Sequence, residues 1–251
     1  MGATGINSRI LKATTIFGGV QGANIICSVL RTKLVAIWIG AAGIGLFGLL
    51  NAAIMLLFTL TQLGLRQSAV RDLAQAPSHR VPATVCAVRR WGLWLGLAGA
   101  LITIAGSPWL SLATFGSYGN WWMFAALSAT VLLSSLNNAE SAVLQGLQQL
   151  RKLASCSMAG NIGGLAISIP IIYIWRIDGI VPVLIAYYAC AWLALGLYRA
   201  KVPRPDTTQT VGETIAIGRK FITLGIYITV TNLTANFVSF ILISYFNKVG
   251  T

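Results

Sequence analysis

The chain has 251 residues, of which 56% are hydrophobic and only 9% are charged, and its formal net charge is +13. Soluble domains carry roughly 25% charged residues, so this composition excludes a water-soluble globular protein. Runs of about 20 residues with almost no charge match the length of helix that crosses a ~30 Å hydrocarbon core, which predicts an all-α, polytopic transmembrane helix bundle.

Apolar runs separated by short polar connections predict seven membrane-spanning helices. Their ranges are 13–37, 44–64, 91–113, 121–145, 153–175, 180–198 and 221–245. Pro170 falls within the fifth range and is expected to kink that helix, which neighbouring helices tolerate in lipid. The connection at 66–90 has Ser68 ahead of a helical run and Pro77 after it, so we expect two short helices there.

Lysine and arginine gather in alternate connections. They stand at the N-terminus and after the second, fourth and sixth predicted spans, at Arg9, Lys12, Arg66, Arg71, Arg80, Arg89, Arg90, Arg151, Lys152, Arg199, Lys201, Arg204, Arg219 and Lys220. Positive residues near the ends of spans are retained in the cytoplasm, so the N-terminus is expected to be cytoplasmic. The same rule accounts for most of the net charge, and no nucleic-acid partner is expected.

The first predicted span carries a polar face that includes a cation. Gln21, Asn24, Ser28 and Arg31 are spaced i, i+3, i+7 and i+10, which keeps them within an arc of about 80° on a helix. Polar residues in lipid face a bundle interior or a wet cavity, so Arg31 is expected to line a cavity. Lys33 projects about 200° away from Arg31 and is expected to reach the headgroups instead.

Three further spans repeat this polar spacing. Their residues are Thr130, Ser134, Asn137, Ser141, Gln145 and Gln148 in the fourth, Ser157, Asn161, Gly164 and Ser168 in the fifth, and Thr229, Asn232, Asn236 and Ser239 in the seventh. Interhelical packing explains any single serine or threonine. Four such helices, one of them cationic, predict a hydrated path with Asn137, Ser141, Asn161 and Asn232 among its substrate contacts. Glu140 lies about 100° off the face of the fourth span, so it is interpreted as an interfacial carboxylate, with cation coupling as the alternative.

The sequence contains no pattern of an enzyme site. It has no nucleophile elbow, no HExxH, no phosphate-binding loop and only five carboxylates, so general acid–base chemistry has few candidates. Its four cysteines, Cys27, Cys86, Cys156 and Cys190, show no metal-ligand spacing and are expected to be buried small residues. We therefore expect no enzyme activity, no metal site and no cofactor.

Two segments resemble a known family. The opening "ILKATTIFGGVQGANIICSVLRTKLVAIWIGAAGIGLFGLLNAA" at 10–53 and "TQLGLRQSAVRDLA" at 61–74 are similar to the start of bacterial Wzx-type O-antigen translocases. These polysaccharide flippases belong to the MOP superfamily, together with lipid II flippases and MATE exporters. The match is specific over roughly the first 75 residues and is supported afterwards mainly by topology.

The resemblance implies that the chain moves an undecaprenyl-diphosphate-linked oligosaccharide across the bacterial inner membrane. It implies two six-helix lobes around a cationic cavity, and it aligns Arg31 with a substrate-contacting arginine of the lipid II flippase. An arginine fork is well suited to an anionic diphosphate. The implied partners are the lipid-linked oligosaccharide, membrane lipids, and other polysaccharide-assembly proteins or a missing C-terminal half.

The length departs from the family, whose members have at least twelve spans. On this pattern 1–198 forms an N-terminal six-helix lobe, 199–220 a cytoplasmic inter-lobe linker, and 221–251 the first helix of an incomplete C-terminal lobe. The chain is then a fragment, or it assembles with another polypeptide. The alternatives are a MATE-like cation-coupled exporter, a membrane-embedded glycosyltransferase or polymerase, and a scaffold that transports nothing.

Overall fold

The structure, a computed structural model, describes residues 3–62, 64–77, 80–199, 212, 214, 215, 218, 229, 234 and 236–245, with the backbone alone at 3–17, 20, 198 and 199. The elements are helical and follow one another with short connections. They are α1 (Ala3–Ile39), α2 (Ala41–Gln62), α3 (Leu65–Gln75), α4 (Val81–Phe115), α5 (Trp121–Gly146), α6 (Leu150–Trp175), the 3₁₀ helix η1 (Arg176–Gly179) and α7 (Ile180–Arg199).

Four helical stretches of the described chain are long and apolar enough to cross a membrane. They are Gln21–Ile39, Ala41–Gln62, Val81–Phe115 and Leu150–Leu197, the last of which contains both α6 and α7. A helix satisfies all its backbone hydrogen bonds internally, which is the requirement for crossing lipid. The chain is therefore a membrane protein built as an all-α helix bundle, as the composition predicts.

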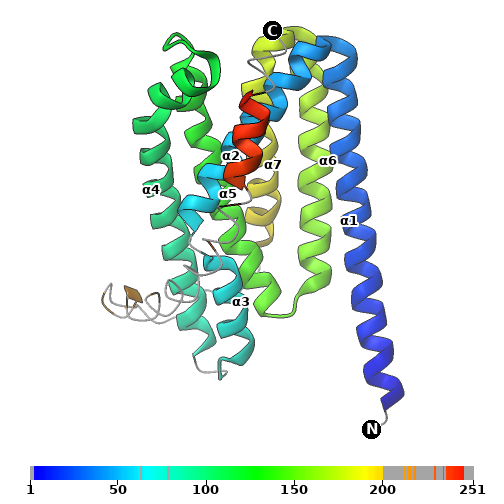
Figure 1. The fold of residues 1–251 in the computed structure, drawn as a ribbon. Coiled ribbons are helices and arrows are strands. Elements are labelled where there is room, and N and C mark those ends of the chain that lie inside the picture. The colour runs from blue at the N-terminus through cyan, green and yellow to red at the C-terminus, as the bar shows by residue number, and fades with distance from the viewer. Residues whose placement is uncertain are drawn as a thin grey trace.

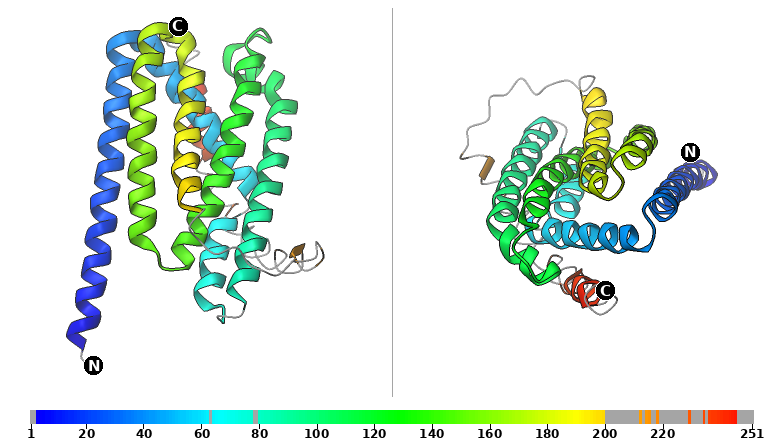
Figure 2. Two further views of the ribbon diagram at one scale, coloured as in Figure 1. Left: turned by 180° about the vertical axis from the view of Figure 1, so that it is seen from behind. Right: turned by 90° about the horizontal axis from the view of Figure 1, so that it is seen from above.

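The long helices form an arc that one tilted helix crosses. α1 packs against α6, α6 against α7, α7 against α5, and α5 against α4. α2 runs obliquely across this arc and contacts α1 at one end and α4 at the other, while the N-terminal part of α1 extends beyond the other helices (Figure 1). Seen from above, α1 and α4 lie on opposite sides of the bundle (Figure 2). The largest apolar core cluster lies where α1, α2, α5 and α7 meet.

Three sequence expectations about the helices differ from the structure. α1 begins at Ala3 instead of residue 13, and α4 begins at Val81 instead of residue 91. Of the two short helices expected within 66–90, the first is confirmed as α3. The prediction of the second is wrong, because 81–90 form the first turns of α4. Pro82 lies in the first turn of α4. The N–H groups in the first turn of any helix have no intrahelical acceptor. Proline, which lacks an N–H, therefore starts this helix without interrupting it.

α4 and α5 approach each other closely through small residues that the sequence analysis did not single out. The Ser135 hydroxyl donates to the Gly92 carbonyl oxygen at 2.7 Å, and a Cβ added at Gly96 would lie 3.0 Å from the Ser135 side chain. Thr103 and Ser107, farther along α4, are fully buried and donate to carbonyl oxygens of their own helix. Small side chains let helix backbones pack closely in lipid, so this face is a packing surface.

Part of the predicted seventh span is described and packs on α2 and the apolar core cluster. Asn236–Tyr245 is a short apolar helix, drawn in red beside α2 in Figure 1. The Asn236 amide donates to the Thr59 hydroxyl at 2.8 Å, and Phe240 belongs to the apolar core cluster. Asn232, most of the predicted linker at 199–220 and most of 221–235 lie outside the described residues.

α6 ends at a residue with an unusual backbone conformation. Arg176 has φ 46° and ψ −119°, in the half of the backbone map that favours glycine. Its backbone N–H donates to the Ile172 carbonyl oxygen and closes the last turn of α6. Such a conformation costs about 1–3 kcal/mol in a residue with a side chain, and it reverses the chain into η1 and α7.

Candidate functional site

The Arg31 side chain lies inside the bundle, where α1, α2 and α7 meet. It is 9% exposed, although α1 turns several large apolar side chains outward around it. Its guanidinium carbon lies 4.2 Å from the centre of the Tyr187 ring on α7 and 5.3 Å from the centre of the Phe47 ring on α2. Both distances are within the range of a cation–π contact, so the two aromatic faces position the cation.

A chain of side-chain hydrogen bonds adjoins this cation. The Tyr187 hydroxyl donates to Asn161 Oδ1 on α6 at 2.5 Å, and Asn161 Nδ2 donates to Asn24 Oδ1 on α1. Three helices are thereby joined through polar groups. We call Asn24, Arg31, Phe47, Asn161 and Tyr187 the Arg31 cluster.

The charge of Arg31 is incompletely satisfied. Its Nε and Nη1 atoms are buried and have no hydrogen-bond partner among the described residues, and no described carboxylate pairs with it. An arginine at mid-membrane costs about 2.5–3.5 kcal/mol on insertion scales unless it is paired or hydrated. Guanidinium N–H groups donate charge-assisted hydrogen bonds to phosphate and carboxylate oxygens, so these two atoms are separate donors available to such a group.

Gly164 on α6 makes room for the ring that contacts the cation. A Cβ added at this position would lie 2.6 Å from Cδ2 of Tyr187 and 3.3 Å from its Cα. One turn earlier, a Cβ added at Gly160 would lie 2.8 Å from the Cα of Ala191. The two glycines therefore allow α6 and α7 to approach closely enough to hold Tyr187 over Arg31.

We expect the Gly164→Ala variant to unfold at a lower temperature than the parent protein, because the added methyl group displaces Tyr187. Overpacking of this kind typically costs about 1–3 kcal/mol. Gly163→Ala is the matched control, because the nearest atom to its new methyl group is Cys190 Cβ at 4.0 Å. Thermal unfolding in detergent measures both variants, and equal midpoints would contradict a tight α6–α7 contact at Gly164.

The remaining predicted site residues divide into several groups. On α1, Gln21 and Ser28 are exposed, so only part of the predicted polar face turns toward α6 and α7. On α5, Thr130 and Ser134 donate to carbonyl oxygens of their own helix, which is the packing interpretation. Asn137 and Ser141 also lie on α5, and the Asn137 Oδ1 atom is buried without a hydrogen-bond partner among the described residues.

Glu140 on α5 forms a two-pronged ion pair with Arg89 on α4. Arg89 Nη2 donates to Glu140 Oε1 at 2.6 Å, and Arg89 Nε donates to Oε2 at 2.9 Å. The two side chains are 13% and 9% exposed, so the pair is largely buried. Both oxygens of the Glu140 carboxylate accept hydrogen bonds from Arg89, so its charge is neutralised by a partner within the bundle. A role of Glu140 in cation coupling stays a prediction.

Sequence reasoning missed Tyr187 and Phe47, which hold the cation of the Arg31 cluster. Both stand in apolar runs where aromatic residues are ordinary core or lipid-facing residues. One signal was available for Tyr187, because a phenolic hydroxyl within a span needs a hydrogen-bond partner. No comparable signal marks Phe47.

Comparisons with known proteins identify a structural relative. The chain superposes with a TM-score of 0.65 on a solved structure of a MOP superfamily transporter from Pyrococcus furiosus Vc1 (DSM3638), whose binding pocket has a reverse polarity that suggests a different function. The superposition covers 88% of this chain and 52% of the transporter at 16% sequence identity, so this chain spans about half of that protein's length. No protein-family model and no curated protein sequence matches the chain. The chain thus shares the helical fold of about half of that transporter.

Proposed function

We propose that this chain takes part in flipping an undecaprenyl-diphosphate-linked O-antigen oligosaccharide across the bacterial inner membrane. The observation that carries the proposal is the buried Arg31 guanidinium inside a helix bundle of transporter fold, because two of its nitrogen atoms have no hydrogen-bond partner in the described part of the chain. Opening sequences similar to the Wzx-type flippases support the same substrate class.

The chemistry of the Arg31 cluster suits the polar part of this substrate. A diphosphate carries charge that a lipid interior does not solvate. The arginine guanidinium supplies charge-assisted hydrogen bonds that replace those from water. Asn24 and Asn161 offer amide groups beside the guanidinium for sugar hydroxyls. Gln21 and Ser28, exposed on the same helix, continue the polar path, and Asn137, Ser141 and Asn232 are proposed to extend it.

A cation-coupled exporter fits the described residues less well. Such a carrier attracts its cargo with unpaired acids, whereas Glu140 has both carboxylate oxygens engaged by Arg89. The proposal includes a cytoplasmic N-terminus and a second lobe that completes the cavity, with 1–198 as the first lobe and 199–220 as the linker. That second lobe comes from a C-terminal half or from another polysaccharide-assembly protein.

The test is deletion of the gene in its native strain, followed by complementation. We expect the deletion to remove O-antigen from the cell surface and to leave lipid-linked oligosaccharide accumulating in the cytoplasmic leaflet. Gel analysis of lipopolysaccharide measures the first effect, and accessibility of the lipid-linked sugar to a membrane-impermeant lectin in spheroplasts measures the second. Full O-antigen display in the deletion strain overturns the proposal, as does loss of display without accumulation of the intermediate.

A further inference from the structure

The contacts of the Arg31 cluster form a circuit that begins and ends on α1. Asn24 on α1 accepts a hydrogen bond from Asn161 on α6, and Asn161 accepts one from the Tyr187 hydroxyl on α7. The Tyr187 ring lies against the Arg31 guanidinium, back on α1. Asn24 and Arg31 are seven residues apart, which is about 10.5 Å along a helix. Tyr187 therefore connects two levels of α1, one through its hydroxyl and one through its ring.

The Tyr187 side chain is held at both its base and its tip. A Cβ added at Gly164 would lie 2.6 Å from Tyr187 Cδ2, so the ring packs directly against α6. The Tyr188 ring meets the Tyr187 ring edge to face, with the ring centres 5.6 Å apart. At the tip, the hydroxyl donates to Asn161, which is itself buried. Packing and one hydrogen bond together fix where the ring lies.

The guanidinium depends on aromatic rings for its position. Nε and Nη1 of Arg31 have no hydrogen-bond partner among the described residues, so hydrogen bonds of these two atoms do not orient it there. The Tyr187 ring centre lies 4.2 Å from the guanidinium carbon, whereas the Phe47 ring centre lies 5.3 Å away. Cation–π attraction acts within about 6 Å of a ring centre. The nearer ring has the larger share in placing the cation, so a group that fixes Tyr187 also fixes Arg31.

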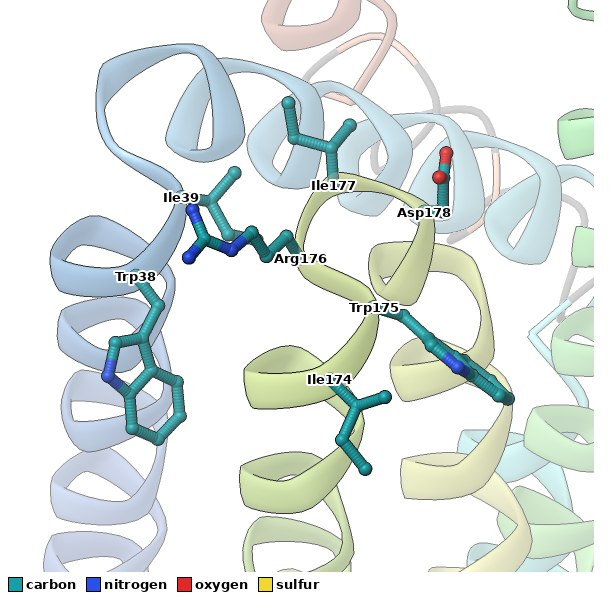
Figure 3. A pocket seen from close by; sticks show the side chains of 7 residues that line it. All are labelled: Trp38, Ile39, Ile174, Trp175, Arg176, Ile177 and Asp178. Carbon is teal, nitrogen blue, oxygen red and sulfur yellow. The ribbon is translucent and has the colours of Figure 1, made fainter.

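The packing of α1 is open on other sides. Large apolar side chains of α1, such as Ile25, Ile26 and Leu30, are exposed. Toward the C-terminal end of α1, a pocket of about 360 Å³ lies between this helix and the end of α6. Figure 3 shows the Trp38 and Arg176 side chains in the space between the two helices. Because α1 and α6 are not closely packed along their whole length, the polar circuit has a specific part in fixing α1.

We propose that Tyr187 is a positioning residue for the lipid-linked diphosphate. Its hydroxyl, held by Asn161, keeps the ring against the Arg31 guanidinium, and Nε and Nη1 are thereby presented to the phosphate oxygens. Tyr187 acts through Arg31 and makes no contact of its own with the diphosphate. A cation that is held in place before the ligand arrives loses less conformational freedom on binding, which raises the affinity. The inference rests on the proposed function, in which Arg31 binds the diphosphate.

The test uses farnesyl diphosphate, a soluble isoprenyl diphosphate, and the purified full-length protein in detergent. Isothermal titration calorimetry measures the affinity. We expect Tyr187→Phe, which removes only the hydroxyl, to weaken binding about 3- to 10-fold, the range that corresponds to one neutral hydrogen bond. Tyr188→Phe is the matched control, because it removes the same group from the next residue of α7, outside the Arg31 cluster. We expect Tyr188→Phe to bind with the parental affinity.

A double-mutant cycle shows whether Tyr187 acts through the cation. In an Arg31→Met protein, adding Tyr187→Phe is expected to cause no further loss of affinity, because the group that Tyr187 positions is absent. An equal loss in both backgrounds would assign the hydroxyl to the framework of the bundle and overturn the positioning role. Thermal unfolding reports whether each variant is folded. Tyr187→Leu, which removes the ring as well, is expected to bind more weakly than Tyr187→Phe.

Failure of this inference and failure of the proposed function give different results. If the parent protein does not bind farnesyl diphosphate, or binds it no more tightly than Arg31→Met does, the proposed function and the positioning role are both overturned. If binding depends on Arg31 but Tyr187→Phe keeps the parental affinity, the positioning role alone is overturned.

Discussion

Replacing Arg31 with methionine is expected to reduce O-antigen display about 10- to 100-fold, because the cation is the proposed ligand of the diphosphate. Hydrogen bonds to charged groups contribute about 1.5–3 kcal/mol, which corresponds to that range of affinity. Methionine keeps a long side chain against Phe47 and Tyr187, so the change removes charge and little volume. Lipopolysaccharide gels of complemented deletion strains measure the effect, with expression checked by immunoblot.

Lys33→Met is the matched control for this variant. Lys33 lies two residues away on the same helix and is exposed, so we expect it to leave display at the parental level. Equal loss of display in the two variants would indicate a general need for positive charge on α1. Full display in Arg31→Met cells would remove Arg31 from the proposed substrate path.

The same substitution should have the opposite effect on stability. Arg31 is buried, and two of its N–H groups have no acceptor among the residues that the structure describes, so its removal relieves a desolvation cost that the cation–π contacts only partly offset. We expect the thermal unfolding midpoint of Arg31→Met in detergent to equal or exceed that of the parent. Loss of activity without loss of stability separates a functional cation from a structural one. A clear fall in the midpoint would assign Arg31 to the framework of the bundle.

Breaking the Arg89–Glu140 ion pair is expected to be the most destabilising single change in α4 and α5. Glu140→Gln leaves the largely buried Arg89 guanidinium without a countercharge, and such changes cost about 3–5 kcal/mol. The pair adjoins the close α4–α5 contact at Gly92, so the loss should also loosen that contact. A fall in the unfolding midpoint of the purified protein measures it.

A double variant separates this structural role from cation coupling. Arg89→Met combined with Glu140→Leu removes both charges, and replacing a buried ion pair by apolar residues is often neutral for stability. We expect the double variant to recover most of the midpoint that Glu140→Gln loses and to restore O-antigen display. Recovered stability without display would instead make Glu140 a coupling residue.

The apolar runs in the sequence were sufficient for the fold class, whereas periodicity placed only part of the polar face of α1. The all-α membrane bundle is confirmed, because a shortage of charge and runs of helical length are consequences of the lipid itself. Arg31 and Asn24 turn inward as their helical spacing predicts, whereas Gln21 and Ser28, in the same row, are exposed. Helical spacing predicts which residues lie on one side of a helix. How many of these residues are covered depends on the packing of the neighbouring helices.

Contacts between helices distant in sequence could not be predicted. The clustering of basic residues in connections predicts a loop position for Arg89, but α4 begins ten residues earlier than its apolar run and carries Arg89 to Glu140. Tyr187 lies 156 positions after Arg31, and its ring reaches the cation because glycines at 160 and 164 bring α6 and α7 together. Tertiary packing determines such pairs, and no local pattern encodes the partner.

The short helix Asn236–Tyr245 lies far along the chain from the helices that it contacts. Phe240 fills part of the cluster formed by α1, α2, α5 and α7, and Ser244 donates to the Ala113 carbonyl oxygen at 3.5 Å. If the polypeptide were cleaved between α7 and this helix, burial of Phe240 in the apolar core cluster would still favour association of the two pieces. Production of the bundle as two separately translated segments is therefore compatible with its architecture.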